Sequence, residues 1–78
     1  MYSQKLSWIS PVVIRRLRRR LAISQRELSR RARVSNALIS RLERRRKDLI
    51  VSREIHFKLA RGLKVDPQVV GKGISSDG

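Results

Sequence analysis

The apolar residues of this chain recur at helical spacing in short segments, which polar and turn-forming residues separate. In the first segment, Ser10 supplies an N-cap and Pro11 takes the first helical position, where a missing N–H is no loss. A helix is therefore predicted over Pro11–Leu21. Its apolar face consists of Val13, Ile14, Leu17 and Leu21.

Two further helices are predicted after short breaks. Ser24 and Glu27 form a capping box, in which the Ser24 hydroxyl accepts the Glu27 amide and the Glu27 carboxylate reaches back to the Ser24 amide. This starts a helix that ends near Ala32, and Ser35 then caps a third helix from Asn36 to about Arg44. Two short helices separated by about three residues make a helix-turn-helix.

The C-terminal half predicts a fourth helix capped by Ser52, with Phe57 bordering its apolar face, and a last short helical turn from Asp66-Pro67 to about Gly71. The expected fold is all-α, a compact bundle of about five short helices. We expect an N-terminal arm over residues 1–9, the domain over 10–71 and a flexible tail over 72–78. The apolar face of the fourth helix consists of Ile55, Leu59, Ala60 and Leu63.

Charge narrows the kind of partner. Twenty Lys and Arg against six Asp and Glu give a formal net charge of +14, so the partner should be a polyanion. Most of these cations are Arg, which favours bidentate contacts with phosphates and base edges. With no cysteine and one histidine, neither a disulfide nor a zinc site is expected, and no cofactor is predicted.

The apolar content predicts a soluble protein inside the cell. No run approaches the roughly 18 apolar residues that a membrane span needs. The segment Met1–Ser10 also lacks the apolar stretch of a secretory signal. No membrane partner is therefore expected.

The predicted third helix has two chemically different sides. At about 100° per residue, its polar, small and cationic residues share an arc of about 140°, while Ile39 and Leu42 face the other way. Leu38 projects between the two sides, which suits either the core or a thymine methyl. Periodicity alone fits an ordinary amphipathic surface helix equally well. The polar arc consists of Asn36, Ala37, Ser40, Arg41 and Arg44.

Residues 14–66, about two thirds of the chain, resemble the lambda repressor/Cro-type (XRE) family of helix-turn-helix DNA-binding domains. The resemblance lies in the order and spacing of IRRLR (14–18), ISQRELS (23–29) and VSNALISRLE (34–43). Leu59, Ala60, Leu63 and Val65 match the fourth-helix signature of the family. The resemblance implies a domain that places the third helix in the major groove of duplex DNA. It also implies a cytoplasmic location, in a prokaryotic, phage or plasmid context and associated with the nucleoid.

Carried over by position, the resemblance assigns roles to individual residues. Gln25 is expected to contact a phosphate and to buttress the start of the third helix. Asn36 and Ala37 are expected at base edges, where Asn can pair bidentately with adenine and Ala can touch a thymine methyl. Arg41 is expected on guanine or phosphate. Arg18 and Glu43 are expected to form a partly buried ion pair that links the first helix to the end of the third.

Two departures from the family pattern concern the turns. Arg33 stands where many relatives have Gly, which predicts either a left-handed backbone conformation at some cost or a different turn. The loop between the third and fourth helices is longer than in the family. The basic run that begins this loop is expected to contact phosphates. The complete set of expected DNA contacts is Gln25, Ser35, Asn36, Ala37, Leu38, Ser40, Arg41, Arg44, Arg45 and Arg46.

The sequence favours a transcriptional regulator of repressor or controller type, which binds duplex DNA as a homodimer and has no small-molecule effector. Val69, Val70 and Ile74 are candidate dimer contacts. The alternatives are an antitoxin-like or bridging protein-interaction module of the same fold, and a basic RNA-binding protein. An enzyme is not expected. Trp8 is expected to pack over the end of the first helix, and His56 to lie on a helix surface.

Overall fold

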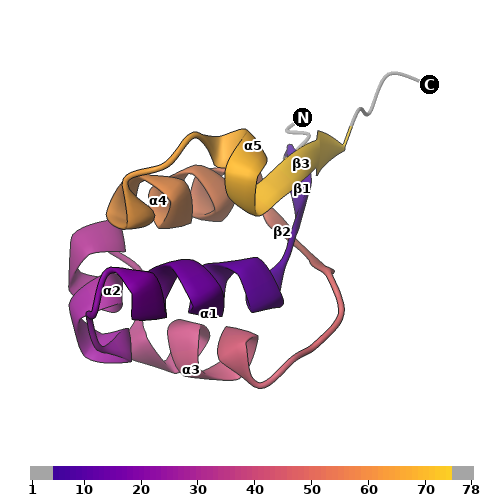
Figure 1. Ribbon diagram of the computed structural model, residues 1–78. Coiled ribbons are helices and arrows are strands. Elements are labelled where there is room, and N and C mark those ends of the chain that lie inside the picture. Colours follow the sequence, from indigo (N-terminus) through magenta and orange to yellow (C-terminus); the bar gives the residue numbers. More distant parts are fainter. Residues whose placement is uncertain (1–4, 75–78) are drawn as a thin grey trace.

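The computed structural model describes residues 5–74, as five helices and a small antiparallel sheet (Figure 1). The five predicted helices are confirmed, but the sheet corrects the all-α expectation. The helices are α1 (Pro11–Arg20), α2 (Gln25–Ala32), α3 (Asn36–Glu43), α4 (Arg53–Leu63) and α5 (Pro67–Val70). The strands are β1 (Leu6–Ile9), β2 (Leu49–Ser52) and β3 (Gly71–Ile74).

Serine side chains start four of the helices, each at the predicted residue. In every case the hydroxyl accepts the amide three residues on, as in the 3.0 Å bond from the Glu27 amide to Ser24. The second half of the predicted capping box is wrong. The Glu27 carboxylate accepts instead from Arg30 and Arg31, at 2.8 and 2.9 Å. The four caps are Ser10, Ser24, Ser35 and Ser52.

The sheet has the strand order β2-β1-β3, with both pairs antiparallel. The sheet joins three segments for which no strand was predicted. β1 lies in the expected N-terminal arm, β2 in the expected loop between α3 and α4, and most of β3 in the expected C-terminal tail. Leu6 lies opposite Ser52 on one side and Ile74 on the other. A side chain adds to this pairing, because Arg53 Nη2 donates to the carbonyls of Leu6 and Ile74 at 3.3 and 3.2 Å.

The two faces of β1 differ in burial, as alternation along a strand requires. Ser7 and Ile9 point inward and are fully buried, whereas Leu6 and Trp8 point outward. Trp8 lies between Ile50 and Lys72 of the neighbouring strands and stays 43% exposed, so its expected position over the end of α1 is corrected. The sheet thus covers one side of the core with its inner face only.

The core lies between the helices, with α1 packed against α3 on one side and against α4 and α5 on the other (Figure 1). Partly buried residues surround this core. They include Leu49, Val51 and several residues of the predicted apolar faces. Phe57, expected at the border of this core, is 51% exposed. The buried core residues are Ile9, Ile14, Leu28, Ala32, Ile39, Leu42, Leu59, Ala60, Leu63 and Val70.

Two expectations about α4 and α5 are wrong. His56 is buried rather than on a helix surface, and its Nε2 lies 2.7 Å from the Pro67 carbonyl, to which it must donate. This bond fastens the start of α5 to α4. Val70, a candidate dimer contact, is 1% exposed and belongs to the core, while Val69 beside it is 46% exposed.

Arg33 ends α2 in the left-handed conformation, with φ of 59° and ψ of 43°. Its amide donates to Arg30, and the next amide, of Val34, closes onto the Ser29 carbonyl at 3.1 Å. This is the helix ending that Gly usually provides. The turn therefore keeps the geometry of a Gly-containing turn although it carries an arginine.

We expect Arg33→Gly to raise the free energy of unfolding by about 0.5–1 kcal/mol, since Gly removes the left-handed penalty while adding unfolded-state entropy. Urea denaturation of the variant and the wild type measures the change. Arg26→Gly is the matched control, because Arg26 is an exposed residue of α2 at which Gly should be destabilising by about 1 kcal/mol. Equal losses in both variants would contradict this account of the turn.

Candidate nucleic-acid interface

The two sides of α3 face opposite environments. Ile39, Leu42 and Glu43 are buried against the domain, and Leu38 packs partly against the core. The expected reading arc points outward. Of its residues Ser40 is half-buried, and those exposed are Asn36, Ala37, Arg41 and Arg44.

The start of α3 is fixed by its own N-cap. Ser35 accepts the Leu38 amide at 3.0 Å, so its hydroxyl is engaged in capping while the residue remains exposed. Asn36 and Ala37 follow in the first turn, where backbone amides still lack helical partners. The turn of Arg33–Ser35 thereby presents these two side chains at an outer corner of the domain.

A charged network ties three helices together. Arg18 of α1 donates from Nε to Glu43 Oε2 at 2.6 Å and from Nη2 to Oε1 at 2.7 Å, a bidentate contact. Arg18 Nη1 also donates to the Ile23 carbonyl at 2.8 Å, in the turn before α2. The side chains are largely buried, with exposed fractions of 13% for Arg18 and 4% for Glu43. The end of α3 is therefore held against α1 and the α1–α2 turn.

Gln25 joins this network from the first position of α2. Its Nε2 donates to Glu43 Oε1 at 3.1 Å, so Gln25 buttresses the end of α3. The sequence had predicted that it would buttress the start of α3. The first turn of α2 beside it is a place where backbone amides attract anions. The network thus sets the angle between the N-terminus of α2 and the outward face of α3.

The pKa values of the network follow from its contacts. Burial acts to raise the pKa of the Glu43 carboxyl, but hydrogen bonds from Arg18 and Gln25, with the charges of Arg18 and Arg15, hold it below its ordinary value. The hydrogen bond to Glu43 raises the pKa of Arg18. Both groups therefore stay ionised at neutral pH.

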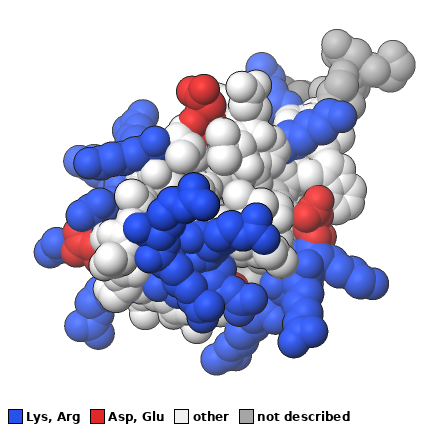
Figure 2. Space-filling model, in the orientation of Figure 1, with Lys and Arg blue, Asp and Glu red and all other residues white. Residues whose placement is uncertain are grey.

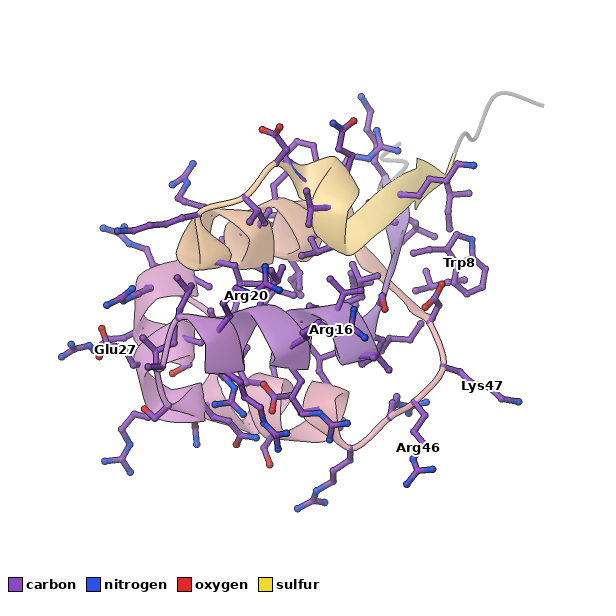
Figure 3. The ribbon with its side chains drawn as sticks, viewed as in Figure 1. Trp8, Arg16, Arg20, Glu27, Arg46 and Lys47 are labelled. Carbon is purple, nitrogen blue, oxygen red and sulfur yellow. The ribbon has the colours of Figure 1, made fainter. Side chains whose placement is uncertain are left out.

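The basic run after α3 leaves the body of the domain. Arg44, Arg45, Arg46 and Lys47 are all exposed. Figure 3 shows Arg46 and Lys47 pointing outward from the loop between α3 and β2. Flexible cations at the end of a groove-facing helix are suited to phosphates on either side of the groove.

Sequence reasoning overlooked a second group of cations, on α1. Figure 2 shows Lys and Arg gathered over the front of the molecule, where α1 lies, as well as along the lower edge near α3. The signal was present in the sequence, because arginines repeat four residues apart along this helix. The arginines of α1 other than Arg18 are Arg15, Arg16, Arg19 and Arg20.

A pocket of about 570 Å³ opens on another side of the domain, between the sheet, α4 and α5. Lys5, Arg53 and Lys72 border it, together with His56 and Gln68. None of its lining residues belongs to α2 or α3, so it is separate from the outward face of α3.

Over residues 5–74, every helix is too short or too polar to span a bilayer. No group of three or more His, Cys, Asp or Glu residues there is arranged to hold a metal ion.

In this domain α3 is capped, has a polar, cationic outer side and is fixed at its end by the preceding helix, α2. This is the arrangement of a helix-turn-helix DNA-binding domain. A family model described as a helix-turn-helix domain matches residues 12–70. The chain belongs to this family, which is of the XRE/lambda-repressor type. No curated protein and no solved structure matches the chain.

Proposed function

We propose that this protein is a sequence-specific regulator of transcription, which binds duplex DNA as a homodimer and inserts α3 into the major groove. The observation that carries the proposal is the outward arc of α3, which is polar and cationic and stands on a buried apolar side. The major groove is about 12 Å wide and admits one α-helix with its side chains. The family supports a DNA-binding role of this kind.

In this arrangement each part of the outer surface of α2 and α3 has a distinct task. Asn36 at the start of α3 reads adenine through its amide, and Ala37 contacts a thymine methyl. Arg41, one turn further along, reaches guanine or a phosphate. The N-terminus of α2 and the exposed run Arg44–Lys47 hold phosphates on the two sides of the groove. Base contacts then give specificity, and phosphate contacts give register.

The homodimer is proposed because one helix of eight residues covers few base pairs. Two copies related by a two-fold axis would read two half-sites about one helical turn apart, which multiplies specificity. Val69 and Ile74 remain candidate contacts, since Val69 is exposed and Ile74 half-buried. The outer face of the sheet adds exposed Leu6, Trp8 and Ile50 as apolar side chains.

Asn36→Ala is expected to relax base preference at one position of each half-site by about 1–3 kcal/mol, because it removes a bidentate base contact. Selection of bound sites from random duplex DNA, followed by sequencing, measures the preference of the variant and the wild type. The matched control is Gln68→Ala, which deletes an exposed amide on α5. This control should return the wild-type consensus.

The same selection tests the homodimer and the role of Asn36, and a competition between RNA and duplex DNA tests the function. Inverted half-sites about one helical turn apart support the homodimer, and a single half-site excludes it. An unchanged consensus for Asn36→Ala would remove Asn36 as the reader. Stronger binding to structured RNA than to duplex DNA in competition would overturn the function itself.

A further inference from the structure

The outer face of α1 is a cationic surface that the proposed contacts of α3 leave unused. We propose that it holds the phosphate backbone of a DNA segment other than the one that α3 reads. This inference rests on the proposed function, because it assumes that α3 occupies a groove. The surface, here called the α1 face, consists of Arg15, Arg16, Arg19 and Arg20.

Helical geometry separates these four arginines from Arg18. At about 100° per residue, they share an arc of about 140°, while Arg18 projects about 60° beyond its edge, toward Glu43. Arg15 and Arg19, like Arg16 and Arg20, stand four residues apart, with a rise of about 6 Å along the helix. Three of the four are exposed, and Arg15 is half-buried.

Within residues 5–74, no carboxylate forms an ion pair with the α1 face. Glu43 pairs with Arg18, Glu27 with Arg30 and Arg31, and Glu54 with Lys58. No other ion pair was found among those residues, and α1 has no acidic residue in its first turn. Like charges four residues apart disfavour a helix. A bound polyanion would relieve this repulsion.

The α1 face turns away from the groove that α3 would enter. α1 packs on the inner side of α3, so their axes stand about 8–10 Å apart, with α1 farther from the DNA. Arg15 lies at the α3 side of the face, near enough to Glu43 to stabilise its charge. Figure 3 shows Arg16 and Arg20 on the part of α1 that faces α4 and α5. These two arginines therefore need a separate segment of backbone.

The chemistry of the α1 face fits phosphates better than an acidic protein surface. The only other residue within its arc is Val12, which is half-buried, so the face lacks the apolar centre of a protein interface. Duplex DNA presents closely spaced negative charges and is contacted largely by side chains of this type. The segment can come from the same duplex, bent around the domain, or from a second duplex.

The test uses the full chain and the double variant Arg16→Gln/Arg20→Gln. Its matched control is Arg61→Gln/Lys64→Gln, which removes the same charge from exposed positions at the end of α4. In one arm, an immobilised duplex with the selected site captures a second, labelled duplex of unrelated sequence. In the other arm, the salt dependence of binding is compared between a duplex limited to the site and one with long flanks. Urea denaturation checks that both variants fold.

The expected result is a loss specific to the α1 variant in one of the two arms. If the segment is a second duplex, capture falls at least tenfold in this variant and persists in the control. If it is flanking DNA, the log-log salt slope steepens on the long duplex by about 1.8 for each protomer, about 0.9 for each of its two contacts, and the variant loses that increment. Equal behaviour of variant and control in both arms would overturn the inference.

This outcome is distinguishable from failure of the proposed function. The α1 variant should return the same selected consensus as the wild type, because Arg16 and Arg20 lie away from α3. Asn36→Ala should alter the consensus and, on an immobilised duplex that carries its own selected site, leave capture of the second duplex unchanged. If no consensus emerges for the wild type, sequence reading by α3 fails, while an unselected duplex still tests the α1 face.

Discussion

Glu43→Ala is expected to lower the free energy of unfolding by about 3 kcal/mol, the lower end of the range for removing one partner of a buried ion pair. The substitution leaves the guanidinium of Arg18 largely buried without its bidentate acceptor, and the Gln25 amide loses the same acceptor. It also frees the end of α3 from α1. Urea denaturation followed by circular dichroism measures the loss.

Glu54→Ala is the matched control for this experiment. Glu54 pairs with Lys58 at 3.6 Å, and its side chain is 76% exposed. A solvent-exposed pair four residues apart in a helix contributes only about 0.3–0.5 kcal/mol. Similar losses in the two variants would show that the contact between Arg18 and Glu43 is no stronger than a surface pair.

Acid denaturation gives a second readout for Glu43→Ala. The folded protein holds the pKa of Glu43 below its ordinary value of 4.5, so the pair stabilises the fold above that pH. This contribution is lost as the pH falls below 4.5 and through the lowered pKa, because the carboxyl becomes protonated. The wild type should therefore lose more stability between neutral and acid pH than the variant does. A constant difference between them at all pH values would contradict the assignment.

Gly71→Ala is expected to lower the free energy of unfolding by about 3 kcal/mol, the upper end of the usual range for an overpacked site. A Cβ at this position would overlap with the Trp8 carbonyl oxygen and lie 2.9 Å from Ile9 Cγ2. The oxygen belongs to the backbone of β1, so it cannot move without disturbing the pairing with β3. The backbone of Gly71 is extended, with φ of −173°, so the effect is steric.

The matched control for Gly71→Ala lies two residues further along β3. A Cβ on Gly73 would meet the Arg53 guanidinium, 2.8 Å from Nη2, and this side-chain end can shift at the cost of its long hydrogen bonds to Leu6 and Ile74. Gly73→Ala should therefore cost less than about 1 kcal/mol. The two variants are compared by thermal and urea denaturation. Equal effects would mean that β1 and β3 are not closely paired.

The helices were predictable because their signals are local. Each serine cap lies three residues from the amide that it accepts, and each apolar face repeats within one segment. The possible left-handed conformation at Arg33 followed from the residue that relatives carry there. Element starts were therefore accurate, and α1 and α3 each ended one residue earlier than expected.

The sheet was not predictable for the opposite reason. Each strand has only four residues, below the usual five or six, and β3 contains two glycines, which strands disfavour. The stability of the sheet depends on the pairing of strands that lie far apart in the sequence. The burial of His56 has the same origin, since its partner is the Pro67 carbonyl at the start of α5.

The candidate site was predictable in part. The outward arc of α3 follows from periodicity, and the structure places its residues together on one surface. Gln25 is different, because its partner depends on how α2 crosses α3, and the bond goes to Glu43 at the far end of α3. The α1 face was not predicted, because the family pattern marks only Arg18 among the arginines of this helix. DNA contact by any of these residues remains a prediction.

The pairing of β1 with β2 and β3 also bears on how the chain folds. The helices form from neighbouring residues and can nucleate early, whereas β1 must find strands from the middle and the opposite end of the described chain. The entropy of closing those long loops disfavours early formation of the sheet. We therefore expect the sheet to close last, after the helix-turn-helix has assembled.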